Sequence, residues 1–108
     1  MKKLFVALAI LVAMNASGQW IQKNNGMGNQ SIFAIAGIGS SLFAASHSAI
    51  FLSTNNGENW TSKLSSSNSF SSLLIKGQYI FAGSIGGGIQ VSTNNGETWT
   101  PSNNGLSN

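Results

Sequence analysis

The sequence predicts an all-β protein made of antiparallel four-stranded β-propeller blades, about two blades with partial strands at the ends, in an incomplete propeller. Three observations support this class: a long internal repeat, four short apolar segments in each repeat, and connections rich in Gly, Ser and Asn. Four short strands in a repeat of about 40 residues are typical of a propeller blade. A β-solenoid is the alternative, although its coil is usually shorter and lacks the hairpin motif described below.

The repeat is clearest in a short segment that occurs twice. Residues 53–60 read STNNGENW, and residues 92–99 read STNNGETW, so the two copies differ only at Asn59 and Thr98. The tryptophans Trp20, Trp60 and Trp99 are almost evenly spaced along the chain. Trp20 and Trp99 each begin the pattern Trp-x-x-x-Asn-Asn-Gly, so both ends of the chain belong to the same series.

Each repeat contains four segments with the length and composition of β-strands. They are short, bounded by Gly, Ser or Asn, and too brief for helices. The expected strands are 32–36, 42–45, 49–52 and one through Trp60-Thr61, matched by 70–75, 79–82, 88–91 and one through Trp99-Thr100.

The N-terminal segment, residues 1–18, has the pattern of a secretory signal peptide. Lys2 and Lys3 precede an unbroken apolar run, residues 4–14, which is too short to span a bilayer and is followed by small or polar residues. Cleavage between Gly18 and Gln19 is expected, with cleavage after Ala16 or Ser17 as the alternative. The mature protein is therefore expected to be secreted, periplasmic or on the cell surface.

The rest of the chain divides into four parts. Residues 19–30 are expected to form an N-terminal strand and loop, a candidate for the strand that clasps a propeller. The first blade is expected at 31–68, the second at 69–101, and the start of a third repeat at 102–108. Two blades leave two open blade faces, so the chain is expected to be a fragment of a longer reading frame or a subunit that self-associates, with remaining blades or a second copy as partner.

The segment that occurs twice is interpreted as a tight hairpin turn. Asn56-Gly57 and Asn95-Gly96 are Asn-Gly steps, and both residue types tolerate positive φ. Ser and Asn side-chain oxygens before each step can accept hydrogen bonds from backbone amides of the turn. Each turn carries one carboxylate, whereas calcium sites normally use several, so no metal is expected here.

These residues resemble the Asp-box of bacterial neuraminidase (BNR) repeats, with the pattern Ser-x-Asn-x-Gly-x-x-Trp and Asn at the position that gives the box its name. The same box occurs in sialidases, sortilin-type receptors and many secreted bacterial proteins. The resemblance implies a structural role at the periphery of a blade, away from any active site. The residues that match are Ser53, Asn55, Gly57, Trp60, Ser92, Asn94, Gly96 and Trp99.

The inventory of reactive residues argues against an enzyme. Only 6% of the chain is charged, and it has no Cys, no Arg and no Asp. The only acids, Glu58 and Glu97, occupy equivalent positions of successive repeats, so they do not form the carboxylate pair of a glycosidase. His47, the only histidine, has no Asp to orient it and is expected in a solvated loop. No catalytic residue, cofactor or metal is predicted.

The sequence therefore predicts a secreted non-catalytic module with a structural or a protein- or glycan-binding role. The alternative is an N-terminal fragment of a sialidase-like or other glycoside hydrolase whose catalytic residues lie outside this chain. Nucleic acid is not expected as a partner. Without the signal peptide, three lysines face two glutamates, a net charge of +1, which is too small for a phosphate-binding surface.

Overall fold

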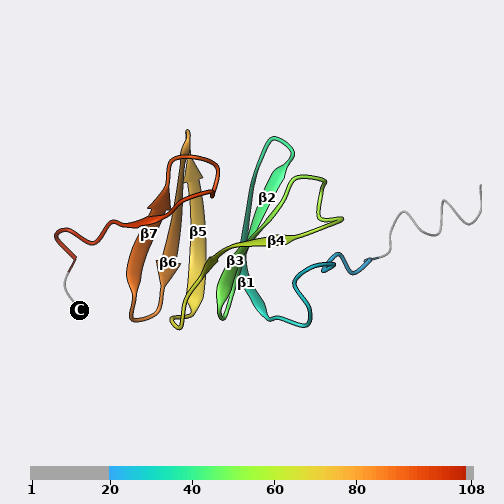
Figure 1. The fold of residues 1–108 in the computed structure, drawn as a ribbon, viewed down its shortest axis with the longest axis horizontal. Coiled ribbons are helices and arrows are strands. Elements are labelled where there is room, and N and C mark those ends of the chain that lie inside the picture. Colours follow the sequence, from blue (N-terminus) through green and yellow to red (C-terminus); the bar gives the residue numbers. More distant parts are fainter. Residues whose placement is uncertain (1–19, 107–108) are drawn as a thin grey trace, which may run out of the picture.

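A computed structural model describes residues 20–106, and this part of the chain folds into two antiparallel sheets of four strands each, without a helix (Figure 1). The all-β prediction and the two four-stranded sheets are confirmed; the described residues do not close a propeller ring. The first sheet contains β1 (Ile32–Ile38), β2 (Ser41–Ser46), β3 (Ala49–Ser53) and β4 (Thr61–Ser65). The second contains β5 (Phe70–Lys76), β6 (Tyr79–Ser84), β7 (Gly88–Ser92) and β8 (Thr100–Pro101).

The two sheets have the same strand order, and the registers of their first three strands correspond. In both, neighbouring strands are consecutive in sequence, as expected for short hairpin connections. An irregularity between Ile32 and Ala34 in the β1–β2 pair recurs between Phe70 and Ser72, at the equivalent place in the β5–β6 pair. The sequence repeat is therefore also a repeat of backbone geometry.

One apolar core lies between the two sheets. Side chains alternate between the two faces of a strand, so every second residue of β2 and β3 points toward the second sheet. Phe43 and Ile50 of the first sheet and Phe70 of the second are almost completely buried in this core. The other buried members are Ala45, Leu52, Ile80 and Ala82. Neither sheet buries this face without the other, so the two sheets stabilise each other.

The N-terminal segment, residues 20–31, covers the other face of the first sheet. Met27 is buried there against Ala44, Phe51 and Trp60. Figure 1 shows this segment on the side of the first sheet that faces away from the second. The first sheet is therefore covered at least in part on both faces, whereas the second has one covered face.

Two expectations about strands differ from the structure. The N-terminal segment contains a turn at residues 25–27 and no strand. Its backbone bonds to the segment 53–60, called the first Asp-box turn below, instead of to a sheet edge. The fourth strands begin at Thr61 and Thr100, directly after the tryptophans that were expected inside them. The backbone N–H of Trp60 donates to Asn25 O at 2.9 Å, outside the sheet.

The signal peptide expected at residues 1–18 and the cleavage position at Gly18 and Gln19 lie outside the described residues. Within residues 20–106 there is no helix long and apolar enough to cross a membrane.

Candidate functional site

The first Asp-box turn is organised around the buried hydroxyl of Ser53, which is 1% exposed. Its Oγ accepts a hydrogen bond from Gly57 N at 2.8 Å and a longer one from Asn55 N at 3.4 Å. The same hydroxyl donates to Asn55 Oδ1 at 3.0 Å, and this oxygen also accepts from Asn59 N at 2.9 Å. One hydroxyl and one amide oxygen thus satisfy turn amides that have no strand partner.

The backbone of this turn needs the Asn-Gly step. Asn56 has a φ of 59° and Gly57 a φ of 87°, in the left-handed region that asparagine and glycine tolerate best. The turn closes with a bond from Glu58 N to Asn55 O at 3.3 Å. The sequence is therefore suited to this conformation at each position of the turn.

The second turn repeats the first almost atom for atom. Ser92 Oγ accepts from Gly96 N at 2.8 Å and donates to Asn94 Oδ1 at 3.0 Å. Asn94 Oδ1 accepts from Thr98 N at 2.9 Å. Asn94 Nδ2 also donates to Thr98 Oγ1 at 2.7 Å, a bond that Asn59 does not make in the first turn. The side-chain amide oxygen of Asn55 or Asn94 therefore accepts the hydrogen bonds of the turn amides, and no carboxylate is needed at this position.

The two box tryptophans have different partners. Trp60 is buried and donates from Nε1 to Lys23 O at 2.6 Å, so it ties the N-terminal segment to the first turn. Trp99 is partly buried and donates to Gly96 O at 2.8 Å within its own turn. Different side chains lie next to the two turns, since Lys23 stands against Gly57 and Phe43 stands against Gly96.

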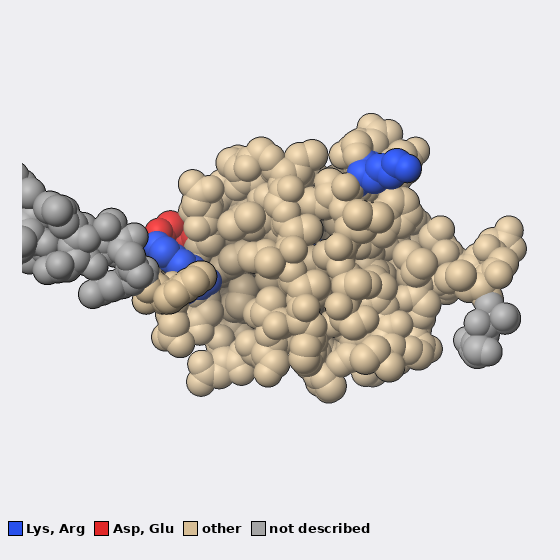
Figure 2. Space-filling view, turned by 180° about the vertical axis from the view of Figure 1, so that it is seen from behind, with Lys and Arg blue, Asp and Glu red and all other residues tan. Residues whose placement is uncertain are grey.

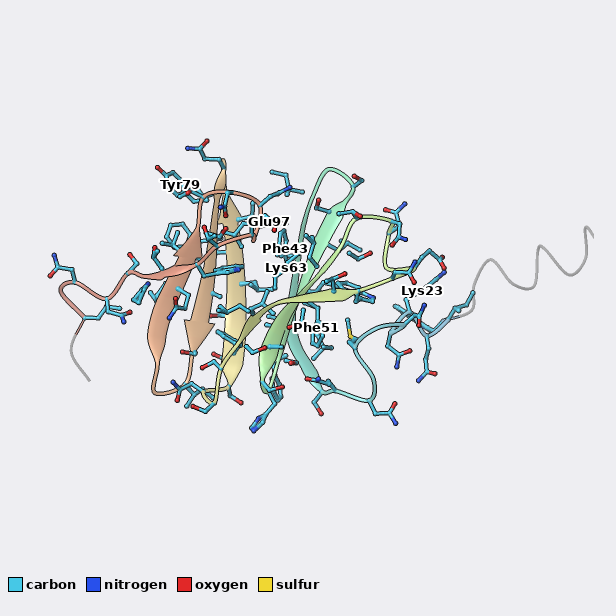
Figure 3. All side chains as sticks on the ribbon, in the orientation of Figure 1. Lys23, Phe43, Phe51, Lys63, Tyr79 and Glu97 are labelled. Carbon is cyan, nitrogen blue, oxygen red and sulfur yellow. The ribbon has the colours of Figure 1, made fainter. Side chains whose placement is uncertain are left out.

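Each Asp-box glutamate pairs with a lysine of the preceding repeat. Lys63 Nζ lies 2.9 Å from Glu97 Oε1, and Lys23 pairs with Glu58 in the same way. Both lysines stand at the third position after a tryptophan of the series. Figure 3 shows Lys63 and Glu97 close together where the two sheets meet. The ion pairs therefore link consecutive repeats, and the N-terminal segment takes the place of a preceding repeat at the first turn.

The regular spacing of these lysines and glutamates is a signal that sequence analysis missed. The interval from Lys23 to Lys63 equals that from Trp20 to Trp60, and Glu58 and Glu97 are separated as Trp60 and Trp99 are. When a lysine and a glutamate each recur at the repeat spacing, the sequence alone suggests that they pair between neighbouring repeats.

The remaining titratable side chains do not assemble into a reactive cluster in the described part of the chain. His47 is exposed, and its Nδ1 lies 2.6 Å from Ser69 Oγ, next to the start of β5. Residues 20–106 contain no group of three or more His, Cys, Asp or Glu side chains that could hold a metal ion. Figure 2 shows one face of the molecule with few charged atoms on it.

A comparison with protein families agrees with the repeat seen in the sequence and in the two sheets. The fold defines an all-β protein of stacked four-stranded antiparallel sheets. Residues 90–101 match the family model of the BNR/Asp-box repeat. The chain therefore carries an Asp-box repeat in its second sheet, as the resemblance predicted, and the first sheet contains the same motif at residues 53–60.

One solved structure extends the comparison of the fold. It is the crystal structure of the computationally designed Ika4 protein, with a TM-score of 0.56 and 11% sequence identity over 75% of this chain. At this identity the likeness concerns the fold alone. The chain spans about half, 52%, of the length of the designed chain. No curated protein matches the sequence.

Proposed function

We propose that this chain is a secreted, non-catalytic β-propeller repeat module with a structural or a protein- or glycan-binding role. One observation carries the proposal: the motif Ser and Asn side chains and the Glu of both Asp-box turns are engaged in hydrogen bonds or ion pairs within the protein. Ser53 and Asn55 hold backbone amides, and Glu58 is paired with Lys23. The copies in the second sheet do the same. A carboxylate whose oxygen is engaged by a lysine is a poor nucleophile, because the ammonium group competes with a substrate for its lone pairs.

A small polar hollow between the two turns supports the binding role. It has a volume of about 240 Å³ and lies where the sheets meet. Its lining offers hydroxyl, amide and charged groups, from Thr54, Asn59, Thr61, Lys63 and Glu97. Neutral hydroxyl ligands such as sugars suit such a surface, since each can both donate and accept hydrogen bonds.

The binding role is tested with the mature chain on a glycan array and by calorimetry with any sugar that the array identifies. Thr54→Val removes a hydroxyl of the hollow while keeping the shape of the side chain, and we expect it to weaken binding. Thr93→Val, at the equivalent exposed position of the second turn outside the hollow, is the matched control. A sugar that binds Thr54→Val as well as the wild type does not use this hollow.

Catalysis is tested with fluorogenic sialosides and other aryl glycosides. We expect no turnover above the buffer rate, because no acid in the described part of this chain stands beside a second one. Turnover that disappears in Glu58→Gln or Glu97→Gln, variants that keep the side-chain shape, contradicts the non-catalytic proposal.

The alternative, that these sheets belong to a longer sialidase-like or other glycoside hydrolase, has its own test. Further repeats bearing Arg and Asp in the reading frame beyond codon 108 favour the hydrolase. A C-terminal sorting or adhesion domain there favours the binding module.

Secretion is tested by the N-terminal sequence of the protein recovered outside the cytoplasm. We expect this product to begin at Gln19. A cytoplasmic protein that retains Met1 contradicts this part of the proposal.

A further inference from the structure

Each sheet has two faces, called here the forward face, which points toward the C-terminal end of the molecule, and the back face, which points toward the N-terminal end. The sequence repeat shows which residues occupy equivalent positions on the two sheets. The forward face of the first sheet packs against the second sheet and contains Phe43, Ala45, Ile50 and Leu52. The back face of the second sheet packs against this forward face. At the equivalent positions of the repeat, the forward face of the second sheet contains similar apolar or small residues, which are Phe81, Gly83, Ile89 and Val91.

The forward face of the second sheet has no described segment packed on it. Leu74 on this face is 59% exposed, and Phe81, Ile89 and Val91 are only partly buried. A mostly apolar hollow of about 420 Å³ lies there, lined by Leu74, Phe81 and Ile89 among others. The equivalent side chains of the first sheet, Phe43 and Ile50, are fully buried by the neighbouring sheet, so the open face has the same chemistry as an established interface.

The complementary back face lies at the opposite end of the molecule. On the first sheet this face contains Ile35, 63% exposed, and the partly buried Leu42. The N-terminal segment covers it only partly, and a hollow of about 430 Å³ remains between Ile35, Leu42 and Met27. Figure 1 shows the two sheets in a row, with the N-terminal segment and the C-terminal segment at opposite ends.

We propose that the forward face of the second sheet binds the back face of the first sheet in a second copy of this chain, head to tail. The contact between the two sheets of one chain, called the internal interface, indicates how the copies would meet. Phe43 packs against Gly96 there, and Phe81 of one copy would pack in the same way against Gly57 of the next. At Gly57 this place is held by the N-terminal segment, with Lys23 Cβ 3.5 Å from where a Cβ on the glycine would stand. Binding of the second copy would therefore have to displace the N-terminal segment at Lys23, where Trp60 Nε1 and Glu58 hold it.

Charge does not oppose this contact. The position that Lys63 occupies at the internal interface is taken by Ser102 at the new one, opposite Glu58 of the second copy. A neutral serine facing a glutamate brings no like-charge repulsion. The contact is heterologous, so it can continue into a ring or an open array. The proposal goes beyond the proposed function, because it holds whatever ligand the module binds.

The test is sedimentation and light scattering of the mature chain over a concentration series, with three variants. Leu74→Glu places a charge on the forward face, and Ile35→Glu places one on the back face. Ile85→Glu is the matched control, since Ile85 is 68% exposed in the β6–β7 connection, outside both faces. All three sites are exposed, so the monomer tolerates the charge, and far-ultraviolet circular dichroism checks the fold.

We expect the wild type and Ile85→Glu to form oligomers whose size grows with concentration, and each of the other two variants to be a monomer. Mixed in equal amounts, Leu74→Glu and Ile35→Glu should form a one-to-one dimer, because each retains the face that the other lost. A wild type that stays monomeric overturns the proposal. So does a dimer broken by Leu74→Glu but not by Ile35→Glu, which indicates contact between two forward faces.

Discussion

Phe43 of β2 lies directly against Gly96 of the second Asp-box turn. A Cβ built on Gly96 would come within 2.8 Å of Phe43 Cε1. Phe43 is fully buried, and Figure 3 shows it between the two sheets. The glycine of the motif therefore has two roles, because it permits a φ of 86° and leaves room for an aromatic ring of the preceding sheet.

Replacing this glycine should destabilise the protein more than replacing its counterpart. Gly96→Ala is strained by its positive φ, at about 1–3 kcal/mol, and also clashes with Phe43. Gly57→Ala has the same backbone strain, with a φ of 87°, but its Cβ meets nothing closer than 3.5 Å. Urea unfolding should give a lower midpoint for Gly96→Ala than for Gly57→Ala. Equal midpoints would mean that the ring does not press on the turn.

The serine hydroxyls should matter equally in the two turns. Ser53→Ala and Ser92→Ala each leave a buried glycine amide without its partner at 2.8 Å. The expected loss is about 1–3 kcal/mol of unfolding free energy in either variant. Ser71→Ala, at an exposed strand position, is the control and should change stability by less than about 0.5 kcal/mol. Losses at Ser53 and Ser92 no larger than the control's would contradict the hydrogen-bond assignment.

The indole of Trp60 should hold the N-terminal segment in place. Trp60→Phe keeps most of the ring but removes the bond from Nε1 to Lys23 O. Trypsin should then cut after Lys23 faster than in the wild type, because local opening exposes the backbone to the protease. Trp99→Phe loses a bond only within its own turn, so its cleavage rate at Lys23 should be unchanged. Faster cleavage in both variants would indicate a general loss of stability instead.

The ion pair between repeats should contribute little and should respond to salt. The Glu97 side chain is 61% exposed and that of Lys63 is 22% exposed. Glu97→Gln is expected to cost at most about 1 kcal/mol in dilute buffer. The difference from the wild type should shrink in high salt, because screening weakens exposed charge pairs. A loss that persists at high salt would contradict a screened, exposed charge pair as its cause.

Much of the architecture could be predicted from local sequence. Repeated apolar segments bounded by Gly, Ser and Asn placed the strands of both sheets close to where they lie, because strand period and turn residues are local properties. The Asn-Gly steps indicated positive φ, and Asn56 and Asn95 adopt it. The side-chain bonds of the turns followed from the same short segments.

Contacts between repeats could not be predicted in the same way. The contact between Phe43 and Gly96 depends on how the two sheets stack. The two residues are far apart in sequence, so no local pattern indicates that they meet. The N-terminal segment was expected to form a strand because Trp20 belongs to the tryptophan series. In the structure its backbone bonds to the Asp-box turn at Trp60, a partner that strand patterns do not reveal.

Consecutive repeats share one core through contact between an aromatic ring and the next Asp-box turn. The most direct measurement is the nuclear Overhauser effect between the ring protons of Phe43 and the α-protons of Gly96 in the mature chain. We predict a strong cross-peak, because Phe43 Cε1 lies 2.8 Å from where a Cβ on Gly96 would stand, the direction in which one α-proton points. Cross-peaks between paired strands such as β2 and β3, without a Phe43–Gly96 peak, would show that the two repeats are not joined by this contact.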